Sequence, residues 1–300
     1  MDSPLTSAPG IFKTKVASPH RASLCSVPIS KIVATPSGDK PFGFGTGFHY
    51  RCANGRDWLV TNWHVLTARR PDNPGILLGV YPQSPHRIEI PFPTKTAGQF
   101  LAPLPLDLYE GGRPIWNQFS LAKGVDLAAI PLNIPDEVHW PAVQDFAERD
   151  ANPLRPGDEV VIVGCPFLPS IDRPYPIWKR AMVASEPMFT IDGIPQVLLD
   201  APGHLGMSGS PVYKVEDGIT APKPKRDQTH MQYILSLSAD EMKPTKVLTF
   251  VGVYAGTPGK VQSQLESLAL GRMFLASHVD AVAMCGEPGL NEFPPGDIKL

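Results

Sequence analysis

Short apolar runs separated by turn-forming residues follow one another along most of the chain. The sequence contains 35 prolines and 26 glycines, which interrupt the apolar runs too often for long helices. We therefore predict a mostly β structure. A first set of strands is predicted at 43–52, 58–62, 76–81, 87–90 and 127–132, and a second set at 160–164, 179–185, 196–200, 210–213, 234–237 and 249–255. Closing each set into a barrel would remove its exposed strand edges.

The residues before the C-terminal segment have the pattern of a short helix. Ser277 and Asp280 form a possible capping pair, apolar residues continue to Met284, and Gly286 and Pro288 are stop signals. We predict a helix at about 278–285.

The same patterns predict the domain organisation. Residues 1–24 and 287–300 are polar or proline-rich and are predicted to be tails, which leaves one domain at 25–286. Within it, we place a first barrel at about 40–135 and a second at about 155–276. Residues 214–231, which contain the basic run Lys-Pro-Lys-Arg at 223–226, are predicted to form an exposed loop.

Composition excludes several classes of function. The net charge of −2 gives no support to nucleic acid or an anionic membrane as the main partner. No apolar run reaches the roughly 18 residues that a membrane span needs, and no secretory signal is visible, so we expect a cytoplasmic protein. Cys25, Cys52, Cys165 and Cys285 are scattered, and we expect reduced thiols. No group of His, Cys, Asp or Glu has zinc-type spacing, so neither a metal nor another cofactor is expected.

Three polar residues suggest nucleophilic catalysis. Ser208 lies in the turn Gly-Met-Ser-Gly-Ser-Pro, His64 follows the apolar run Trp-Leu-Val-Thr-Asn-Trp, and Asp126 precedes Leu-Ala-Ala-Ile. A serine hydroxyl is nearly inert at neutral pH, so it requires a histidine base and an acid that orients the base. Each residue also has a simpler interpretation, as a turn serine, a core histidine or a strand-flanking acid. Their joint occurrence favours a catalytic triad.

Four segments together resemble a known family. They are Gly45-Thr46-Gly47-Phe48, the histidine segment at 61–65, Asp126-Leu127-Ala128 and the serine turn. From about Phe42 to Cys285 the chain resembles chymotrypsin-fold (trypsin-like) serine peptidases, of the bacterial type similar to the high-temperature-requirement and glutamyl endopeptidase branches. The resemblance implies two antiparallel six-stranded β-barrels. It also implies that His64, Asp126 and Ser208 act at the seam between the barrels, with an oxyanion hole formed by the backbone amides of Gly206 and Ser208. Thr46 is expected to be structural.

Two departures from the digestive peptidases concern activation. Met207 stands where those enzymes carry an aspartate that pairs with a newly cut N-terminus, and no Ile-Val-Gly-Gly start is present. Activation by N-terminal insertion is therefore not expected. The intact chain is expected to be active already, or to be switched by loop ordering or by a regulatory protein partner.

The resemblance also places a substrate pocket, between 201–205 and 252–256. Pro202 replaces the carboxylate of trypsin-type enzymes, and Val253 replaces the histidine of glutamyl endopeptidases. An uncharged, small or medium apolar residue before the cut is the expected preference in a protein or peptide substrate. The candidate binding residues are Pro202, His204, Leu205, Val253, Tyr254, Ala255 and Gly256.

Two other functions remain open at this point. The barrels could form a catalytically silent scaffold that binds another protein, or the triad could hydrolyse a small acyl compound instead of a peptide bond.

Overall fold

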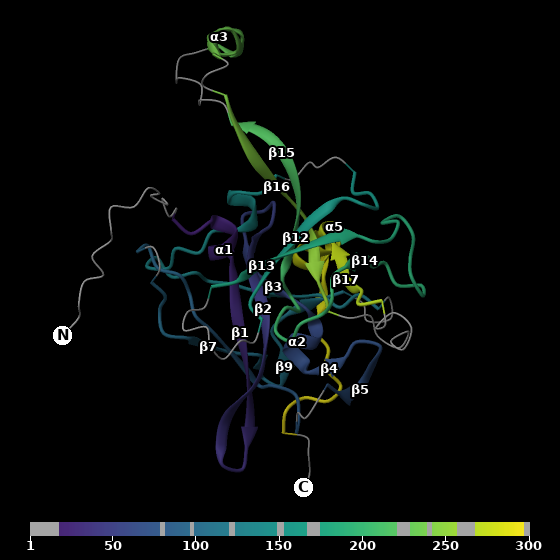
Figure 1. Ribbon diagram of the computed structural model, residues 1–300. Helices are drawn as coiled ribbons and strands as arrows, with labels where there is room; N and C mark the ends of the chain where they lie inside the picture. Colours follow the sequence, from purple (N-terminus) through teal and green to yellow (C-terminus); the bar gives the residue numbers. More distant parts are fainter. Residues whose placement is uncertain are drawn as a thin grey trace, which may run out of the picture.

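The computed structural model shows a mostly β protein with two antiparallel sheets (Figure 1). Short helices lie at the ends of strands. The structure describes residues 18–78, 82–96, 99–119, 124–148, 153–166, 175–220, 229–238, 242–256 and 268–296.

The first sheet has eight strands in the order β18-β10-β11-β3-β2-β1-β6-β7. It forms a half-barrel, because the described strands β18 and β7 at its two edges do not pair with each other. Its strands are β1 (Ser26–Thr35), β2 (Gly38–Arg51), β3 (Asp57–Thr61), β6 (Arg87–Ile90), β7 (Leu104–Asp107), β10 (Asn117–Gln118), β11 (Ala128–Pro131) and β18 (Glu287–Pro288). Two small ribbons accompany it, β4 (Arg69–Arg70) with β5 (Asn73–Leu77) and β8 (Tyr109–Glu110) with β9 (Arg113–Pro114).

The second sheet closes into a six-stranded ring in the order β12-β13-β14-β17-β16-β15. Its strands are β12 (Glu159–Gly164), β13 (Ile177–Val183), β14 (Val197–Asp200), β15 (Pro211–Thr220), β16 (Lys243–Tyr254) and β17 (Gly271–Leu275). A half-barrel followed by a closed ring is consistent with the chymotrypsin double barrel, so the predicted fold class is confirmed. The first sheet differs in remaining open and in having eight strands.

The helices are short. In the part of the chain that the structure describes, they are α1 (Arg21–Cys25), α2 (Trp63–Thr67), α3 (His230–Ser236), α5 (Ala276–Cys285) and the 3-10 turn η2 (Val143–Asp145). Within the described ranges, no helix has both the length and the apolar character to cross a membrane. The predicted C-terminal helix is present, but it begins at Ala276, directly after β17. Asp280 therefore does not act as a cap, and its carboxylate accepts a hydrogen bond from the Tyr50 hydroxyl.

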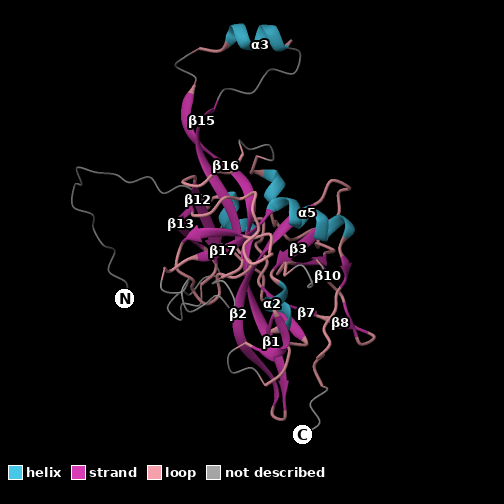
Figure 2. Ribbon diagram, turned by 90° about the vertical axis from the view of Figure 1, so that its right-hand side faces the viewer, coloured by secondary structure: helices cyan, strands magenta, loops and turns pink. Residues whose placement is uncertain are grey.

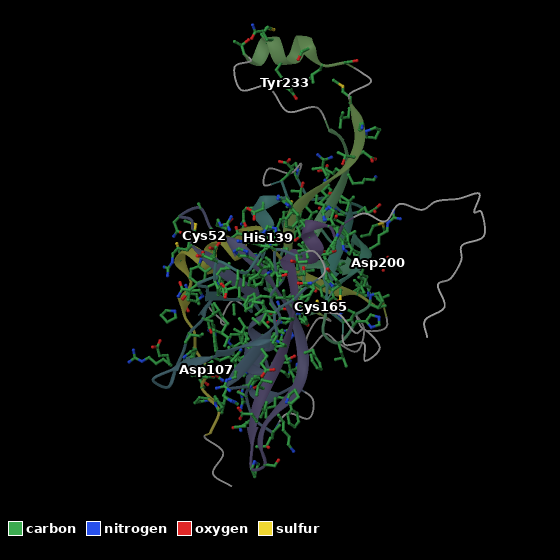
Figure 3. The ribbon with its side chains drawn as sticks, turned by 90° about the vertical axis from the view of Figure 1, so that its left-hand side faces the viewer. Cys52, Asp107, His139, Cys165, Asp200 and Tyr233 are labelled. Carbon is green, nitrogen blue, oxygen red and sulfur yellow. The ribbon has the colours of Figure 1, made fainter. Side chains whose placement is uncertain are left out.

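The loop predicted at 214–231 is in part a β-hairpin. β15 continues to Thr220 and pairs with β16 as far as Lys243, because the ladder satisfies the backbone groups of both strands. The hairpin rises from the body of the protein, with α3 at its far end (Figures 1 and 2). In Figure 3, Tyr233 on α3 lies far from Cys165 in the body. The basic run at 223–226 lies outside the described residues.

The strand predicted at 234–237 is wrong, because most of it belongs to α3. Thr229 and Gln232 explain the helix. The Thr229 hydroxyl accepts the N–H of Gln232, while the Gln232 side chain accepts the N–H of Thr229. This reciprocal pair is a capping box, and its Thr-x-x-Gln signal is present in the sequence.

Both predicted tails contain ordered structure. Residues 21–25 form α1, and at the other end β18 pairs with β10. The C-terminal segment then follows the first sheet, where the Gly289 N–H donates to the Trp116 carbonyl at 2.7 Å and Asn291 is buried. The unsatisfied edge of β10 gives this segment its backbone partners. Residues 1–17 and 297–300 lie outside the described residues.

Eight of the described strands were not predicted, namely β1, β4, β7, β8, β9, β10, β17 and β18, and one was predicted in the wrong sheet. β5 spans Asn73–Leu77 and pairs with β4 in a separate ribbon, whereas the prediction placed a strand of the first barrel at 76–81. β1 begins earlier than the predicted first barrel and lies between β2 and β6.

A shared aromatic cluster joins the two sheets. Phe48 and Tyr50 on β2 pack against Phe250 on β16, which in turn contacts Tyr213 on β15. The ring centroids of Phe48 and Phe250 lie 5.5 Å apart. All four side chains belong to one buried cluster that also includes Val279 of α5. Burial of large aromatic surface between the sheets fixes the seam at which the candidate site lies.

Candidate active site

His64 and Asp126 are brought together by neighbouring strands. β11 pairs with β3, so that Ala128 lies opposite Thr61. His64 follows β3 within α2, and Asp126 precedes β11. The Nδ1 atom of His64 lies 2.6 Å from Oδ2 of Asp126, and the backbone N–H of His64 donates to Oδ1 at 3.0 Å. The Asp126 carboxylate thus contacts both the ring and the backbone of His64, which fixes the ring relative to its own main chain.

The Asp126 carboxylate is fully buried. Burial by itself raises the pKa of Asp126, but the charge and hydrogen bonds of His64, together with the positive charge of Arg272, outweigh it and lower the pKa below its usual value. A guanidinium nitrogen of Arg272 lies 3.3 Å from Oδ2. The backbone is fixed as well, since the Asn62 amide donates to the Asp126 carbonyl at 2.7 Å.

The serine turn is shaped by two glycines. Gly206 and Gly209 have φ angles of 91° and 89°, in the left-handed region that disfavours other residues. The Gly209 N–H donates to the Tyr254 carbonyl at 2.8 Å, which attaches the turn to β16. Ser208 between them is half-buried. Gly256 lies beside it, since a Cβ atom at position 256 would be 3.2 Å from the Ser208 Oγ.

Thr46 on β2 connects the serine turn to the histidine segment. Its N–H donates to the Ser208 carbonyl at 2.8 Å, and its hydroxyl donates to the Gly206 carbonyl at 2.8 Å. The same hydroxyl accepts the N–H of Cys165 at 2.9 Å, and the Thr46 carbonyl accepts from the Thr61 hydroxyl at 2.7 Å. Thr46 therefore packs beside the histidine segment and also fixes two peptide groups of the serine turn.

Close packing leaves no room for a side chain at position 209. A Cβ atom there would lie 2.0 Å from the Thr46 carbonyl oxygen. Met207 turns the other way, is buried and packs in the core of the second barrel. The turn thus has one side chain directed into the barrel and its backbone pressed against β2.

The candidate substrate residues fall into two groups. Pro202, His204 and Leu205 are exposed, and Leu205 retains 85% of its accessible surface. The second group is buried in the core. Its members Val253, Tyr254 and Ala255 are 0%, 1% and 3% exposed. Buried side chains cannot contact a substrate directly.

Backbone groups at the end of β16 and directly after it also form hydrogen bonds within the protein. The Ala255 N–H donates to the Arg272 carbonyl, and the Gly256 carbonyl accepts from the Arg272 N–H, both at 2.9 Å. The Tyr254 carbonyl is taken by Gly209. A substrate backbone therefore cannot form its hydrogen bonds with the Ala255 N–H or with the carbonyls of Tyr254 and Gly256 unless these internal bonds break.

No group of three or more His, Cys, Asp and Glu residues in the described part of the chain is close enough to hold a metal ion. All four cysteines are free, and Cys285 is the exposed one.

Comparison with known families agrees with this arrangement. A family model described as a trypsin-like peptidase domain matches residues 45–219, which is more than half of the chain. The chain belongs to the trypsin-like peptidase family. The matched span includes Thr46, His64, Asp126 and Ser208. A search of curated proteins found no match.

Within this trypsin-like peptidase, one residue at the site was not anticipated from the sequence. Arg272 lies on β17, beyond the span that the family model matches. Its signal is an arginine inside the apolar run Leu-Gly-Arg-Met-Phe-Leu, where an unpaired charge would be costly. Its partner, Asp126, lies 146 positions earlier, and no local pattern connects the two.

Proposed function

We propose that this trypsin-like peptidase is an active serine endopeptidase in which Ser208, His64 and Asp126 form the catalytic triad. The observation that supports it best is the contact between the Asp126 carboxylate and Nδ1 of His64 at 2.6 Å. An ionised carboxylate only accepts hydrogen bonds, so Nδ1 carries a proton in this pair. The neutral ring then has Nε2 as its basic nitrogen, as a general base for Ser208 requires.

The proposed reaction proceeds by acyl transfer. Ser208 Oγ attacks the carbonyl carbon of the scissile peptide bond as Nε2 of His64 takes the hydroxyl proton. The backbone amides of Gly206 and Ser208 stabilise the oxyanion, and Thr46 holds the backbone carbonyls of the same two residues. His64 then gives its proton to the leaving amine. Water, activated by the same histidine, hydrolyses the acyl-enzyme and regenerates Ser208.

We propose a protein or peptide substrate with an uncharged, small or medium apolar residue before the cut. The segment ahead of the nucleophile has Pro202 where trypsin-type enzymes have a carboxylate, which removes the basis for a Lys or Arg preference. At the position of the glutamyl endopeptidase histidine stands Val253, whose side chain is buried. We therefore propose that the protein shares the scaffold of the high-temperature-requirement and glutamyl endopeptidase branches but does not prefer glutamate before the cut.

Regulation is proposed to act without N-terminal insertion. Met207 is buried in the second barrel and offers no carboxylate to a new N-terminus. Loop ordering or a protein partner would be the remaining switch.

A serine-directed probe tests the mechanism. The intact protein is incubated with a fluorophosphonate and with an unfolded protein substrate, beside Ser208→Ala and the control Ser37→Ala, which alters an exposed serine in the β1–β2 turn. Labelling and cleavage in the wild type and in Ser37→Ala, with neither in Ser208→Ala, support the proposal.

The other outcomes overturn it in distinct ways. Labelling without proteolysis indicates hydrolysis of small acyl compounds or an intact chain that still lacks its activation step. Absence of labelling in folded wild-type protein indicates a binding scaffold. Labelling that persists in Ser208→Ala assigns the nucleophile to another residue.

A further inference from the structure

Arg272 places a full positive charge against the buried side of the Asp126 carboxylate. The arginine is 8% exposed, and its guanidinium nitrogen lies 3.3 Å from Oδ2. That same oxygen receives the Nδ1 proton of His64. Nε of Arg272 is directed at the Ala255 carbonyl, 3.4 Å away. One carboxylate oxygen is therefore shared between an imidazole and a guanidinium.

The arginine is held rigidly by its own backbone. Its N–H and carbonyl pair with Gly256 and Ala255, both at 2.9 Å. The guanidinium also lies 5.8 Å from the centre of the Phe274 ring. The fixed backbone, together with the side-chain contacts to the Ala255 carbonyl and to Asp126, holds the charge beside the carboxylate.

A buried arginine is costly unless it is paired, because its guanidinium stays protonated in proteins. Among the described residues, the carboxylate that pairs with Arg272 belongs to Asp126. Among the residues that the structure describes, the ionisable groups around Arg272 are Asp126, His64 from α2 and Tyr254 from β16. Burial raises the pKa of Tyr254 to about 12 although Arg272 opposes the rise, so the phenol is neutral near pH 7. The charges that interact are therefore those of Asp126, Arg272 and the protonated form of His64.

We infer that Arg272 is a positioning residue of the proposed triad, which fixes the Asp126 carboxylate and offsets part of the negative charge that His64 experiences. This inference rests on the proposed function. Without Arg272, the full negative charge of Asp126 would act on His64, and the carboxylate would attract a proton on the ring more strongly. Arg272 thus offsets part of this attraction and keeps the ring correctly oriented.

The test uses the full chain and two substitutions. Arg272→Met removes the charge and keeps an unbranched but shorter side chain, and Arg272→Lys retains a charge but loses the planar fork. The rate constant for fluorophosphonate labelling and kcat/KM for peptide cleavage are measured from pH 5 to pH 9. The matched control is Arg180→Met, an exposed arginine on β13 of the same barrel, which should change neither quantity.

The expected results differ between the two variants. In Arg272→Met, kcat falls about tenfold with little change in KM, and the acid limb of the profile moves up by roughly half to one pH unit. In Arg272→Lys, the acid limb stays near its wild-type position while kcat is reduced. A merely structural role would not move the limb in folded protein.

The outcomes separate this inference from the proposed function. If the wild type is not labelled, the proposed function fails. If the wild type is labelled and folded Arg272→Met shows an unchanged rate and acid limb, the inference about Arg272 fails alone. Failure of both variants to fold would assign the residue to stability and would overturn the inference as well.

Discussion

Asp126 binds His64 at two points, through Oδ2 to the ring nitrogen at 2.6 Å and through Oδ1 to the backbone N–H at 3.0 Å. The two contacts fix both the position and the orientation of the imidazole. We expect Asp126→Asn to leave the backbone contact possible but to lose the charge and the correct ring tautomer. The expected loss in kcat is about ten thousandfold, measured with a peptide substrate on protein whose fold is checked by circular dichroism.

A second histidine–aspartate pair provides the control. Nε2 of His49, which is buried in the first sheet, lies 2.8 Å from Oδ1 of the partly exposed Asp57. Asp57→Asn should lower stability while kcat remains near the wild-type value. Equal losses of kcat in the two variants would show that the loss in Asp126→Asn reflects general damage.

The stability of the protein should depend on the ionisation of Asp126. Its pKa in the folded state is lower than the usual value of 3.8. The carboxylate therefore contributes stability that is complete above its unfolded pKa and is lost as the pH falls through the lower, folded-state pKa. We expect the free energy of unfolding of the wild type to exceed that of Asp126→Asn near neutral pH, with the difference shrinking below about pH 4. Urea denaturation between pH 3 and pH 7 measures this; a constant difference over that range would contradict the assignment.

Thr46 should contribute to both stability and turnover. Thr46→Val keeps the shape of the side chain but removes the hydroxyl that bonds Gly206 and Cys165. Leaving a buried carbonyl and N–H without partners is expected to cost about 1–3 kcal/mol in the free energy of unfolding. The serine turn should also shift, which lowers kcat. Thr46→Ser keeps the hydroxyl and should recover most of both quantities, whereas equal losses in the two variants would point to the methyl group instead.

Two glycines with nearly equal φ angles distinguish the cost of backbone strain from the cost of a steric clash. Gly209 and Gly157 have φ angles of 89° and 87°, but a Cβ atom would meet the Thr46 carbonyl oxygen at 2.0 Å in the first and nothing within 4 Å in the second. Gly157→Ala should cost about 1–2 kcal/mol from backbone strain alone. Gly209→Ala should cost clearly more and should also abolish probe labelling of Ser208. Similar unfolding free energies for the two variants would contradict the close packing against β2.

The four cysteines should differ sharply in reactivity. Cys285 is exposed, whereas Cys25, Cys52 and Cys165 are buried. Burial raises the pKa of the Cys25 and Cys165 thiols, which keeps them protonated and unreactive. Titration with a thiol reagent should modify one cysteine in the native protein and four after denaturation. Native Cys285→Ser should then show no rapid reaction.

Sequence patterns predicted the parts of this protein that depend on local chemistry. The histidine segment, the serine turn and most strands of the second barrel lie where apolar runs and turn residues placed them. α3 was also predictable in principle, because the Thr229–Gln232 capping pair is a local signal.

The remaining features depend on contacts between distant parts of the chain. Thr46 bonds a residue 160 positions away, and Arg272 pairs with a carboxylate 146 positions away. Neither partner can be identified from a window of neighbouring residues. β18 is similar, since a two-residue segment becomes a strand because β10 offers it an edge.

β18 also sets an order of events during synthesis. Because it completes the edge of the first sheet with residues 287–288, that sheet receives its last strand after every strand of the second barrel has been made. A ribosome-bound chain therefore carries β10 with an open edge for the whole time that the second barrel emerges. The first sheet begins earlier in the sequence than the second barrel, yet it is completed later.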